Sequence, residues 1–486
     1  MSLPATIRQL RDEMRGGQSA VAVCEAVLEH IEQIKPLNAF NTVMRDEARA
    51  RAAAIDSDPA RWRNAPLAGI PIAIKDNICT KNVRTTASSR MLERYIPPYS
   101  ATAIERLEAA GAVVVGKTNC DEFAMGSSNE TSAFGPVRNP WSPDRVPGGT
   151  SGGSAAAVAA NAVPVALGSD TGGSIRQPSA LCGVVGLKPT YGRVSRYGLI
   201  AHGSSLDQIG PIGRSVADAA AILSAIAGRD SADATSVDQP TMDYERALTG
   251  DARARIGVPR SLLERGVDPQ VSRAFFAALD VLKSGGAELV DIELPHARYA
   301  IPVYYIVSTA EASSNLARYD GVRYGLRAGP AQGGLHGMYS ATREAGFGAE
   351  VKRRIMLGTY VLSSGYYDAY YLKAQQVRTL IRRDYDAAFD TVEAIAMPTA
   401  PTPAFRLGER VDDPLQMYLG DVFTVSANLT GLPAISVPCG FTAERLPVGL
   451  QLTGRAFGEA AILRIADAYE RQTEWWKQTP TLRFHE

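Results

Sequence analysis

The residue types that acyl transfer needs gather in two serine- and glycine-rich loops, roughly twenty positions apart. The first loop is Pro147-Gly-Gly-Thr-Ser-Gly-Gly-Ser154, and the second is Gly168-Ser-Asp-Thr-Gly-Gly-Ser-Ile175. Glycine lets the backbone approach a substrate closely and turn its N–H groups toward it. Candidate nucleophiles or proton carriers are the hydroxyl groups of Thr150, Ser151, Ser154 and Ser174. The two loops therefore predict a hydrolytic site.

A lysine is available as the base of such a site. Lys75 directly follows the apolar run Ile70-Pro-Ile-Ala-Ile74, which is typical of a buried strand. To act as a base near neutral pH, a lysine needs its pKa lowered by roughly three units from about 10.4, and burial lowers it. Lys75 alone would be interpreted as a charged residue at the exit of a strand. The lysine and the two loops together favour the hydrolytic site.

The second loop also predicts a place for developing negative charge. Ser174 is preceded by Asp170-Thr-Gly-Gly173, whose successive backbone N–H groups could hold an oxyanion. One such donor typically contributes about 3 kcal/mol to stabilising a transition state. The alternative is a glycine-rich turn that binds nothing or caps a helix.

A competing pattern occurs at Gly111-Ala-Val-Val-Val-Gly-Lys-Thr118, which matches the phosphate-loop motif G-x-x-x-x-G-K-[ST]. In a phosphate loop the strand comes before the glycines, whereas here residues 112–115 are themselves the expected strand. We therefore expect the match to be coincidental. A nucleotide-binding switch or ATPase built on Lys117 is the alternative from another functional class.

Histidine and cysteine offer no second chemistry. The five histidines are dispersed, and none has the nucleophile-elbow context of a Ser-His-Asp hydrolase: His30, His202, His296, His336 and His485. His202 is close to the loops in sequence only, and we expect it at the surface or behind the site. The five cysteines lack Cys-x-x-Cys spacing, so neither a metal site nor a disulfide framework is predicted: Cys24, Cys79, Cys120, Cys182 and Cys439.

Composition places the chain among ordinary globular proteins. It has 486 residues, of which 45% are hydrophobic and 21% charged. The 51 basic and 51 acidic residues balance, so no global basic field argues for nucleic-acid binding. The first residues lack the apolar core of a signal peptide, and no run of about 18 uncharged apolar residues occurs. We expect a cytoplasmic, reducing compartment.

Short apolar runs alternate with helical patterns, which predicts an α/β layered fold. The expected strands include residues 70–74, 112–115, 163–167, 184–187, 255–259, 288–293, 394–397, 434–437 and 448–452. The expected helices include residues 19–34, 101–110, 155–162 and 271–284, with long helical stretches over about 306–385. We expect one domain over residues 1–486. Its parts are an N-terminal helical segment (1–60), a catalytic core (61–229), an inserted strand-helix unit with further helices (255–390), and a completion of the core (391–486).

Together these segments resemble the amidase signature family, whose Ser–Ser–Lys hydrolases have a central mixed β-sheet covered by helices on both faces. The resemblance spans about residues 5–475. Within the family it is strongest to the glutamine-hydrolysing components of tRNA-dependent amidotransferases. The segments that carry it are residues 116–128, 188–196, 204–211, 311–316, 351–354 and 417–421.

The resemblance implies a role for each catalytic side chain. Lys75 corresponds to the base, Ser174 to the acyl-forming nucleophile, and position 150 to the hydroxyl that relays a proton between them. The family usually has serine where this chain has Thr150, whose methyl group must fit beside a non-proline cis peptide bond after glycine. Threonine keeps the hydroxyl, so we expect the relay to survive. Ser151 is the alternative relay.

The resemblance also implies a site for the substrate glutamine. Arg354 can bind the α-carboxylate with its planar fork, and Asp421 can hold the α-ammonium group. Tyr305 completes that contact, while Met125 and Ser151 line the pocket. The backbone N–H groups of three residues are the implied oxyanion hole: Thr171, Gly172 and Gly173.

The implied reaction releases ammonia from glutamine through a glutamyl ester on the nucleophile. Similar enzymes pass this ammonia to a partner that activates tRNA-bound glutamate with ATP. The implied assembly is a heterotrimer with the B and C subunits of an amidotransferase, which contacts misacylated tRNA and uses ATP and magnesium. No metal or cofactor is expected in this chain, and no membrane. The alternative within the family is a free-standing amidase that acts on another amide.

Overall fold

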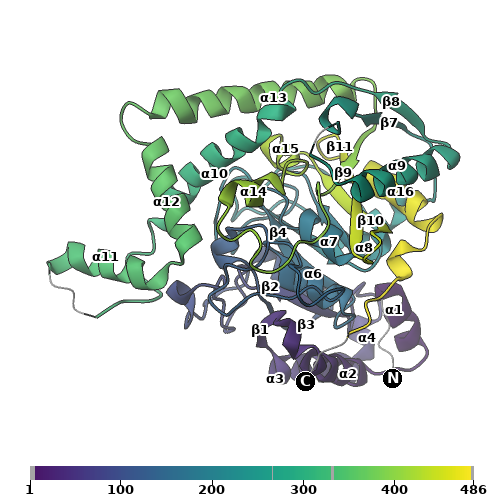
Figure 1. Cartoon of the computed structure of the whole chain (residues 1–486). Helices are drawn as coiled ribbons and strands as arrows, with labels where there is room; N and C mark the ends of the chain where they lie inside the picture. Colours follow the sequence, from purple (N-terminus) through teal and green to yellow (C-terminus); the bar gives the residue numbers. More distant parts are fainter. Residues whose placement is uncertain (1–5, 265, 330–332, 483–486) are drawn as a thin grey trace.

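The computed structural model describes residues 6–264, 266–329 and 333–482, and these residues contain one sheet of eleven strands (Figure 1). The strands are β1 (Phe40–Val43), β2 (Pro71–Lys75), β3 (Val113–Thr118), β4 (Val165–Asp170), β5 (Val185–Lys188), β6 (Gln208–Gly213), β7 (Arg255–Val258), β8 (Glu288–Asp291), β9 (Ala394–Pro398), β10 (Ala434–Phe441) and β11 (Pro447–Gly454). Their order is β1-β3-β2-β4-β6-β5-β10-β11-β9-β7-β8.

The sheet is mixed. β2 pairs in parallel with β3 and with β4, and β7 pairs in parallel with β8 and β9. The other neighbouring pairs are antiparallel. The expected α/β fold with a central mixed sheet is confirmed.

Alternation along the strands divides the core between the two faces of the sheet. Successive side chains of a strand point to opposite faces. In β2, Ile72 and Ile74 belong to one buried cluster and Ala73 to another. β4 repeats the pattern, with Val165 on the first side and Ala166 on the second. Both faces of the sheet are therefore buried.

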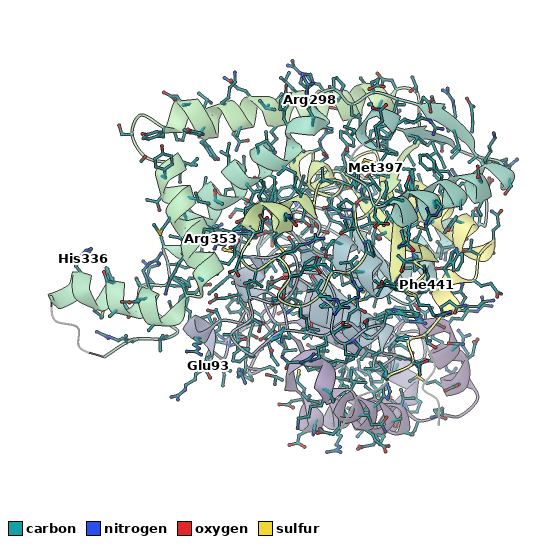
Figure 2. The ribbon with its side chains drawn as sticks, viewed as in Figure 1. Glu93, Arg298, His336, Arg353, Met397 and Phe441 are labelled. Atoms are coloured by element: carbon teal, nitrogen blue, oxygen red, sulfur yellow. The ribbon has the colours of Figure 1, made fainter. Side chains whose placement is uncertain are left out.

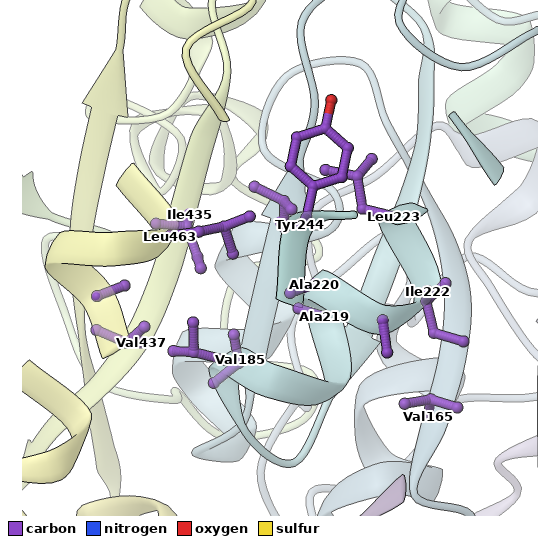
Figure 3. Close-up of a cluster of buried hydrophobic side chains, with 14 of the residues drawn as sticks. Val165, Val185, Ala219, Ala220, Ile222, Leu223, Tyr244, Ile435, Val437 and Leu463 are labelled. Carbon is purple, nitrogen blue, oxygen red and sulfur yellow. The ribbon is translucent and has the colours of Figure 1, made fainter. Parts of the chain in front are cut away.

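Helices cover both faces. The first face packs against α1 (Ile7–Arg15), α5 (Thr102–Ala109), α8 (Val216–Ile226), α9 (Pro269–Ser284) and α16 (Glu459–Arg471). Figure 3 shows part of this core, with Ala219 of α8 near Val185 of β5. The second face packs against α2 (Ala20–Gln33), α3 (Arg45–Ser57), α6 (Gly152–Ala159), α7 (Arg176–Cys182), α10 (Ala300–Leu316), α13 (Lys373–Phe389) and α15 (Val425–Leu429).

The remaining helices lie at the edges of these layers. They are α4 (Pro59–Trp62), α11 (Gly334–Gly346), α12 (Ala349–Val361) and α14 (Pro414–Leu419). α12 packs along α10, whereas α11 projects away from the body of the molecule at the left of Figure 1. None of the helices in the described ranges combines the length and apolar character needed to cross a bilayer.

Most expected elements are present, and two strands were missed. The helix expected over residues 19–34 is α2, and Ser19 Oγ caps it by accepting the Ala22 N–H at 3.0 Å. The segment 1–60 was expected to be helical, but it also contributes β1, which pairs with β3 at the edge of the sheet. β6 was not expected, although it lies at the centre of the sheet between β4 and β5.

Candidate active site

The parallel pairing of β2 with β4 brings the predicted base next to the second loop. The register aligns Ile74 with Leu167, so both strands end at the same edge of the sheet, where open α/β sheets bind ligands. The first loop reaches this edge just before α6. Its Ser151 N–H donates to the Ser174 carbonyl at 3.1 Å, which ties the two loops together. The juxtaposition predicted from the sequence is present.

Lys75 is buried at the end of β2 and contacts hydroxyl groups. Its Nζ donates to Thr150 Oγ1 at 2.6 Å and to Ser169 Oγ at 3.0 Å. Asn77 Nδ2 donates to the same Ser169 hydroxyl at 2.9 Å. Burial lowers the pKa of Lys75 from 10.5 to about 8. A substantial fraction of Lys75 is therefore neutral at slightly alkaline pH, and it can accept a proton.

Thr150 presents its hydroxyl to Lys75 from a turn that requires glycine on its N-terminal side. The Gly149–Thr150 peptide bond is cis, as the family resemblance implies. A Cβ atom at Gly149 would lie 2.8 Å from the Ser128 nitrogen, so a larger residue has no room there. The threonine methyl group fits, because the whole side chain is buried and Oγ1 still reaches Lys75.

Ser151, the alternative relay, has other partners. Its Oγ donates to the Ser169 carbonyl at 3.2 Å, not to Lys75. Ser174 is 7% exposed, whereas Lys75 and Thr150 are wholly buried, so Ser174 is the member of this group that a substrate can reach. Within the described residues no hydrogen bond joins the hydroxyl groups of Thr150 and Ser174. Catalytic hydrogen bonds are often long in free enzymes and tighten when substrate binds.

A buried ion pair holds the turn that carries Ser174. Asp170 accepts hydrogen bonds from the backbone N–H groups of Gly173 at 2.8 Å and Ile175 at 3.1 Å. Arg176 lies 3.0 Å from the same carboxylate and also donates to Gln451 Oε1 at 2.6 Å. Burial raises the pKa of Asp170, but the charge of Arg176 outweighs burial and holds that pKa below its ordinary value. Asp170 therefore stays ionised and fixes the turn.

The hydrogen bonds that Asp170 accepts reduce the three predicted oxyanion donors to two. The Gly173 N–H is already donated to Asp170, which leaves those of Thr171 and Gly172 as the candidate donors. Tyr304 lies directly over Gly172, where an added Cβ would come within 2.5 Å of its ring. Thr424 Oγ1 donates to the Gly172 carbonyl at 2.6 Å. Only glycine fits at position 172.

The three predicted glutamine-binding side chains lie together on α10, α12 and the segment before α15. Arg354 is buried, its Nε is held by Glu350 at 2.8 Å, and its guanidinium lies 5.5 Å from the centre of the Tyr305 ring. Tyr305 stacks on Tyr418 with ring centres 3.8 Å apart. Asp421 is also buried and accepts a hydrogen bond from Ser127 Oγ at 2.6 Å.

Arg354 and Asp421 influence each other electrostatically. Burial raises the pKa of Asp421 to about 7, and the nearby Arg354 guanidinium partly opposes that rise. A cation and an anion thus lie close enough to act on one another, which is what the carboxylate and ammonium groups of a free amino acid require. Met125 is buried in the cluster that includes Val351 of α12, so it lies on the same side of the molecule.

A cavity of about 330 Å³ opens beside these residues. Its walls include Ser127, Glu350 and Tyr418, which contact Asp421, Arg354 and Tyr305 respectively. Arg353, labelled in Figure 2, also lines it from α12. The cavity therefore lies next to the residues predicted to bind glutamine.

Sequence reasoning missed the residues that hold this site in place. They are Ser127, Ser169, Arg176, Glu350, Tyr418 and Thr424. Ser169, Arg176, Glu350 and Tyr418 lie within five positions of a predicted site residue in the sequence, which is a signal that could have found them. Ser127 and Thr424 also belong to the segments next to Met125 and Asp421.

The structure argues against the phosphate-loop alternative. Lys117 lies inside β3 and is wholly buried, and its Nζ donates to the Ile78 carbonyl at 2.5 Å and to Thr85 Oγ1 at 2.9 Å. It also lies 3.8 Å from Asp76. Gly116 packs against the Thr42 carbonyl of β1, so no glycine loop is free to hold a phosphate.

Among the described residues, the histidines and cysteines take no part in a Ser-His-Asp type triad. His30 bonds the Ala160 carbonyl, His296 bonds Asp384, and His336 is exposed on α11. His485 lies outside the described residues. The surface position allowed for His202 is wrong, because its side chain is buried. All five cysteines are buried and free, and the described ranges contain no group of residues able to hold a metal.

Comparisons with known proteins agree with this geometry. The family model described as Amidase matches residues 22–463. The A subunit of a glutamyl-tRNA(Gln) amidotransferase from Roseiflexus sp. (strain RS-1) is 60% identical over 96% of each chain. Among solved structures, the A subunit of the Thermotoga maritima glutamyl-tRNA(Gln) amidotransferase is 43% identical with a TM-score of 0.78, covering 96% of this chain and 94% of its own.

A peptide amidase from Stenotrophomonas maltophilia is 33% identical with a TM-score of 0.82, covering 98% of each chain. The family model and these relatives extend over nearly the whole chain, including both loops, Lys75 and the segment at Asp421. This chain belongs to the amidase family.

Proposed function

We propose that this chain is the glutamine-hydrolysing A subunit of a tRNA-dependent amidotransferase. The observation that carries the proposal is the burial of Arg354 and Asp421 in one group beside a Ser–Thr–Lys site. A free α-amino acid needs a cation for its carboxylate and an anion for its ammonium group. Relatives at 60% and 57% identity, each aligned over at least 96% of this chain, are the A subunits of glutamyl-tRNA(Gln) amidotransferases.

In the proposed first step, Ser174 Oγ attacks the side-chain carbonyl carbon of glutamine. The serine proton passes through Thr150 to Lys75, and the carbonyl oxygen takes negative charge that the N–H groups of Thr171 and Gly172 stabilise. The C–N bond then breaks, and a proton returned from Lys75 lets the nitrogen leave as ammonia. The product of this step is a glutamyl ester of Ser174.

In the second step, water attacks the ester, with Lys75 accepting the proton of the water through Thr150. The ester bond breaks, Ser174 regains its proton, and glutamate is released. The ordered contact between Lys75 and Thr150 at 2.6 Å supports both proton transfers. No metal or cofactor takes part in either step of this proposal.

We place the chain in a cytoplasmic heterotrimer with the B and C subunits. Ammonia released here would pass to the partner that activates glutamate on tRNA(Gln), with ATP and magnesium used by the assembled complex. Aspartate on tRNA(Asn) is a second candidate acceptor, and the choice depends on the partners. The similar proteins are A subunits of glutamyl-tRNA(Gln) amidotransferases, which supports an assembly of several subunits.

A free-standing amidase is the second candidate, because a peptide amidase shares the fold at a TM-score of 0.82. One assay separates the two. Release of glutamate from glutamine is measured for the purified chain alone and with the B and C subunits, and the same preparations are tested on a peptide C-terminal amide. We expect glutamine hydrolysis that increases on assembly. Hydrolysis of the peptide amide without glutamine hydrolysis would refute the proposal.

Matched serine variants provide the control. Ser174→Ala should abolish the activity. Ser154→Ala should keep it within a few-fold, because Ser154 lies in the first loop but bonds Thr118 at 2.7 Å and the Leu167 carbonyl at 3.0 Å, away from Lys75.

A further inference from the structure

His202 is a buried histidine whose ring has no hydrogen-bond partner. Its side chain is 1% exposed, and neither Nδ1 nor Nε2 is paired with any group in the described residues. Buried polar side-chain atoms nearly always have a partner. Leaving one unpaired typically costs about 1–3 kcal/mol, so a ring with both nitrogens unpaired needs an explanation.

Hydrogen bonds hold the backbone around His202 next to the turn that carries Thr171 and Ser174, called the catalytic turn below. The Asp207 carboxylate accepts the His202 N–H at 2.9 Å and the Thr171 hydroxyl at 2.7 Å. From α10, Asn315 Nδ2 donates to the His202 carbonyl at 3.1 Å. The position of His202 is therefore set relative to Thr171, one of the two candidate oxyanion donors.

Two charged residues of the proposed site lie near enough to the ring to act on it electrostatically. The charges of Arg354 and Lys75 act on the imidazole in addition to its burial, and together they hold the pKa of His202 well below 6.5. The backbone of Ala124, next to Met125, opposes this shift, although its contact with the ring lacks the geometry of a regular hydrogen bond. His202 thus lies in the field of both the base and the carboxylate-binding arginine.

The imidazole is neutral at physiological pH because of this low pKa. A neutral imidazole has one N–H donor and one unprotonated nitrogen that accepts. Protonation would place a third cation near Lys75 and Arg354, which their charges disfavour. The ring therefore offers a hydrogen-bond acceptor near Arg354, whose guanidinium group cannot accept.

An acceptor is what the proposed substrate site lacks. Arg354 serves the carboxylate of glutamine, Asp421 serves its ammonium group, and backbone N–H groups serve the carbonyl oxygen. The side-chain NH₂ group has no assigned acceptor. On the basis of the proposed function, we propose that the unprotonated nitrogen of His202 accepts a hydrogen bond from the amide nitrogen of bound glutamine. His202 then selects an amide over an ester or an acid, which present no N–H.

The test compares two substrates on each preparation, glutamine and glutamate γ-methyl ester. His202→Phe should lower kcat/KM for glutamine about ten-fold, the value of one lost hydrogen bond, and leave kcat/KM for the ester within about two-fold. His202→Gln, which keeps an acceptor, should recover most of the glutamine activity. His336→Phe is the matched control, since His336 is exposed on α11 far from the site (Figure 2), and both substrates should be unaffected.

The ratio of the two substrates cancels any loss of folded enzyme, because both are measured on one preparation. An equal fall for both substrates, or no fall for either, would overturn the assignment of His202. Absence of glutamine hydrolysis by the parent chain and its complex would instead overturn the proposed function, so the two failures are distinguishable.

A second measurement leaves position 202 unchanged. In the Ser174→Ala variant, glutamine binds without turning over, and the ¹⁵N resonance of the unprotonated His202 nitrogen is followed as glutamine is added. Acceptance of an N–H bond should move that resonance upfield. Glutamate should not move it in the same way, because its side chain has no N–H to donate. A resonance that glutamine leaves in place would contradict the proposal even if no variant at 202 folds.

Discussion

Replacing Lys75 with methionine tests the base and its burial in one variant. Methionine has similar length and no charge, so Lys75→Met keeps most of the packing at the end of β2. General acid–base catalysis typically contributes about 10²–10⁴-fold. We therefore expect glutamine hydrolysis to fall by at least about 100-fold.

The same variant should change stability in a pH-dependent way. The folded-state pKa of Lys75, about 8, lies below its ordinary value of 10.5. At about 1.36 kcal/mol for each pKa unit, protonated Lys75 opposes folding by about 3 kcal/mol below pH 8. Between pH 8 and 10.5 the unfolded chain binds the extra proton, so the stability of the parent rises with pH and the penalty disappears.

The net effect follows from what methionine loses. The hydrogen bonds of Lys75 to Thr150 and Ser169 are each worth about 1 kcal/mol. Lys75→Met should thus be more stable than the parent by about 1 kcal/mol at pH 7 and less stable by about 1 kcal/mol at pH 10. Groups that both proteins share cancel in this difference.

Urea unfolding of both proteins at pH 7 and pH 10 measures the change, and ammonia release measures the activity. Lys117→Met is the matched control. Lys117 is equally buried, but it lies near Asp76, and its loss should destabilise the fold at both pH values. Retention of more than a tenth of the parent's activity by Lys75→Met, or a stability difference that does not change with pH, would refute the reasoning.

Three further predictions concern the residues around Lys75. Thr150→Val removes the relay hydroxyl at nearly constant shape and should lower kcat at least 100-fold by the same estimate, whereas Thr150→Ser should stay within about ten-fold of the parent. Burial gives Asp421 a pKa of about 7, and Asp421 must be ionised to hold an ammonium group. The value of kcat/KM for glutamine should therefore rise from pH 6 to pH 8.5, as Asp421 ionises and Lys75 loses its proton. A flat profile would contradict both assignments. Arg176→Met leaves the Asp170 charge buried without its partner and should destabilise the chain by about 3–5 kcal/mol, measured as a lower urea midpoint; an unchanged midpoint would show that the pair does not hold the turn.

The strands could be predicted where burial on both faces leaves a continuous apolar run. β2 and β4 have this form because each has a strand on both sides and helices over both faces. β6 has the sequence Gln208-Ile-Gly-Pro-Ile-Gly213, whose two glycines and one proline disfavour a strand by local preference. Its pairing with β4 and β5 overrides that preference. Tertiary pairing of this kind leaves no local signal in the sequence.

The candidate site, like the strands, has some features with a local signal in the sequence and others without one. Its backbone features were predictable because a turn with no space for a Cβ requires glycine, as at Gly149 and Gly172, and this requirement is visible in the residue type itself. The partners that come from distant segments were not predictable, since they depend on which segments meet. Ser127 and Asp421 bond across 294 positions, and Arg176 reaches Gln451 across 275.

His202 is an example of a residue whose surroundings depend on contacts between distant segments. Its neighbours in the sequence suggest a surface turn, but Asp207 and Asn315 hold its backbone between the catalytic turn and α10. The chemistry of an imidazole depends on whether it is charged. Here burial lowers the pKa of His202 most, and the charges of Arg354 and Lys75, each more than a hundred positions away, lower it further. A residue's type thus limits what it can do, while the charges brought around it by the fold select one of those possibilities.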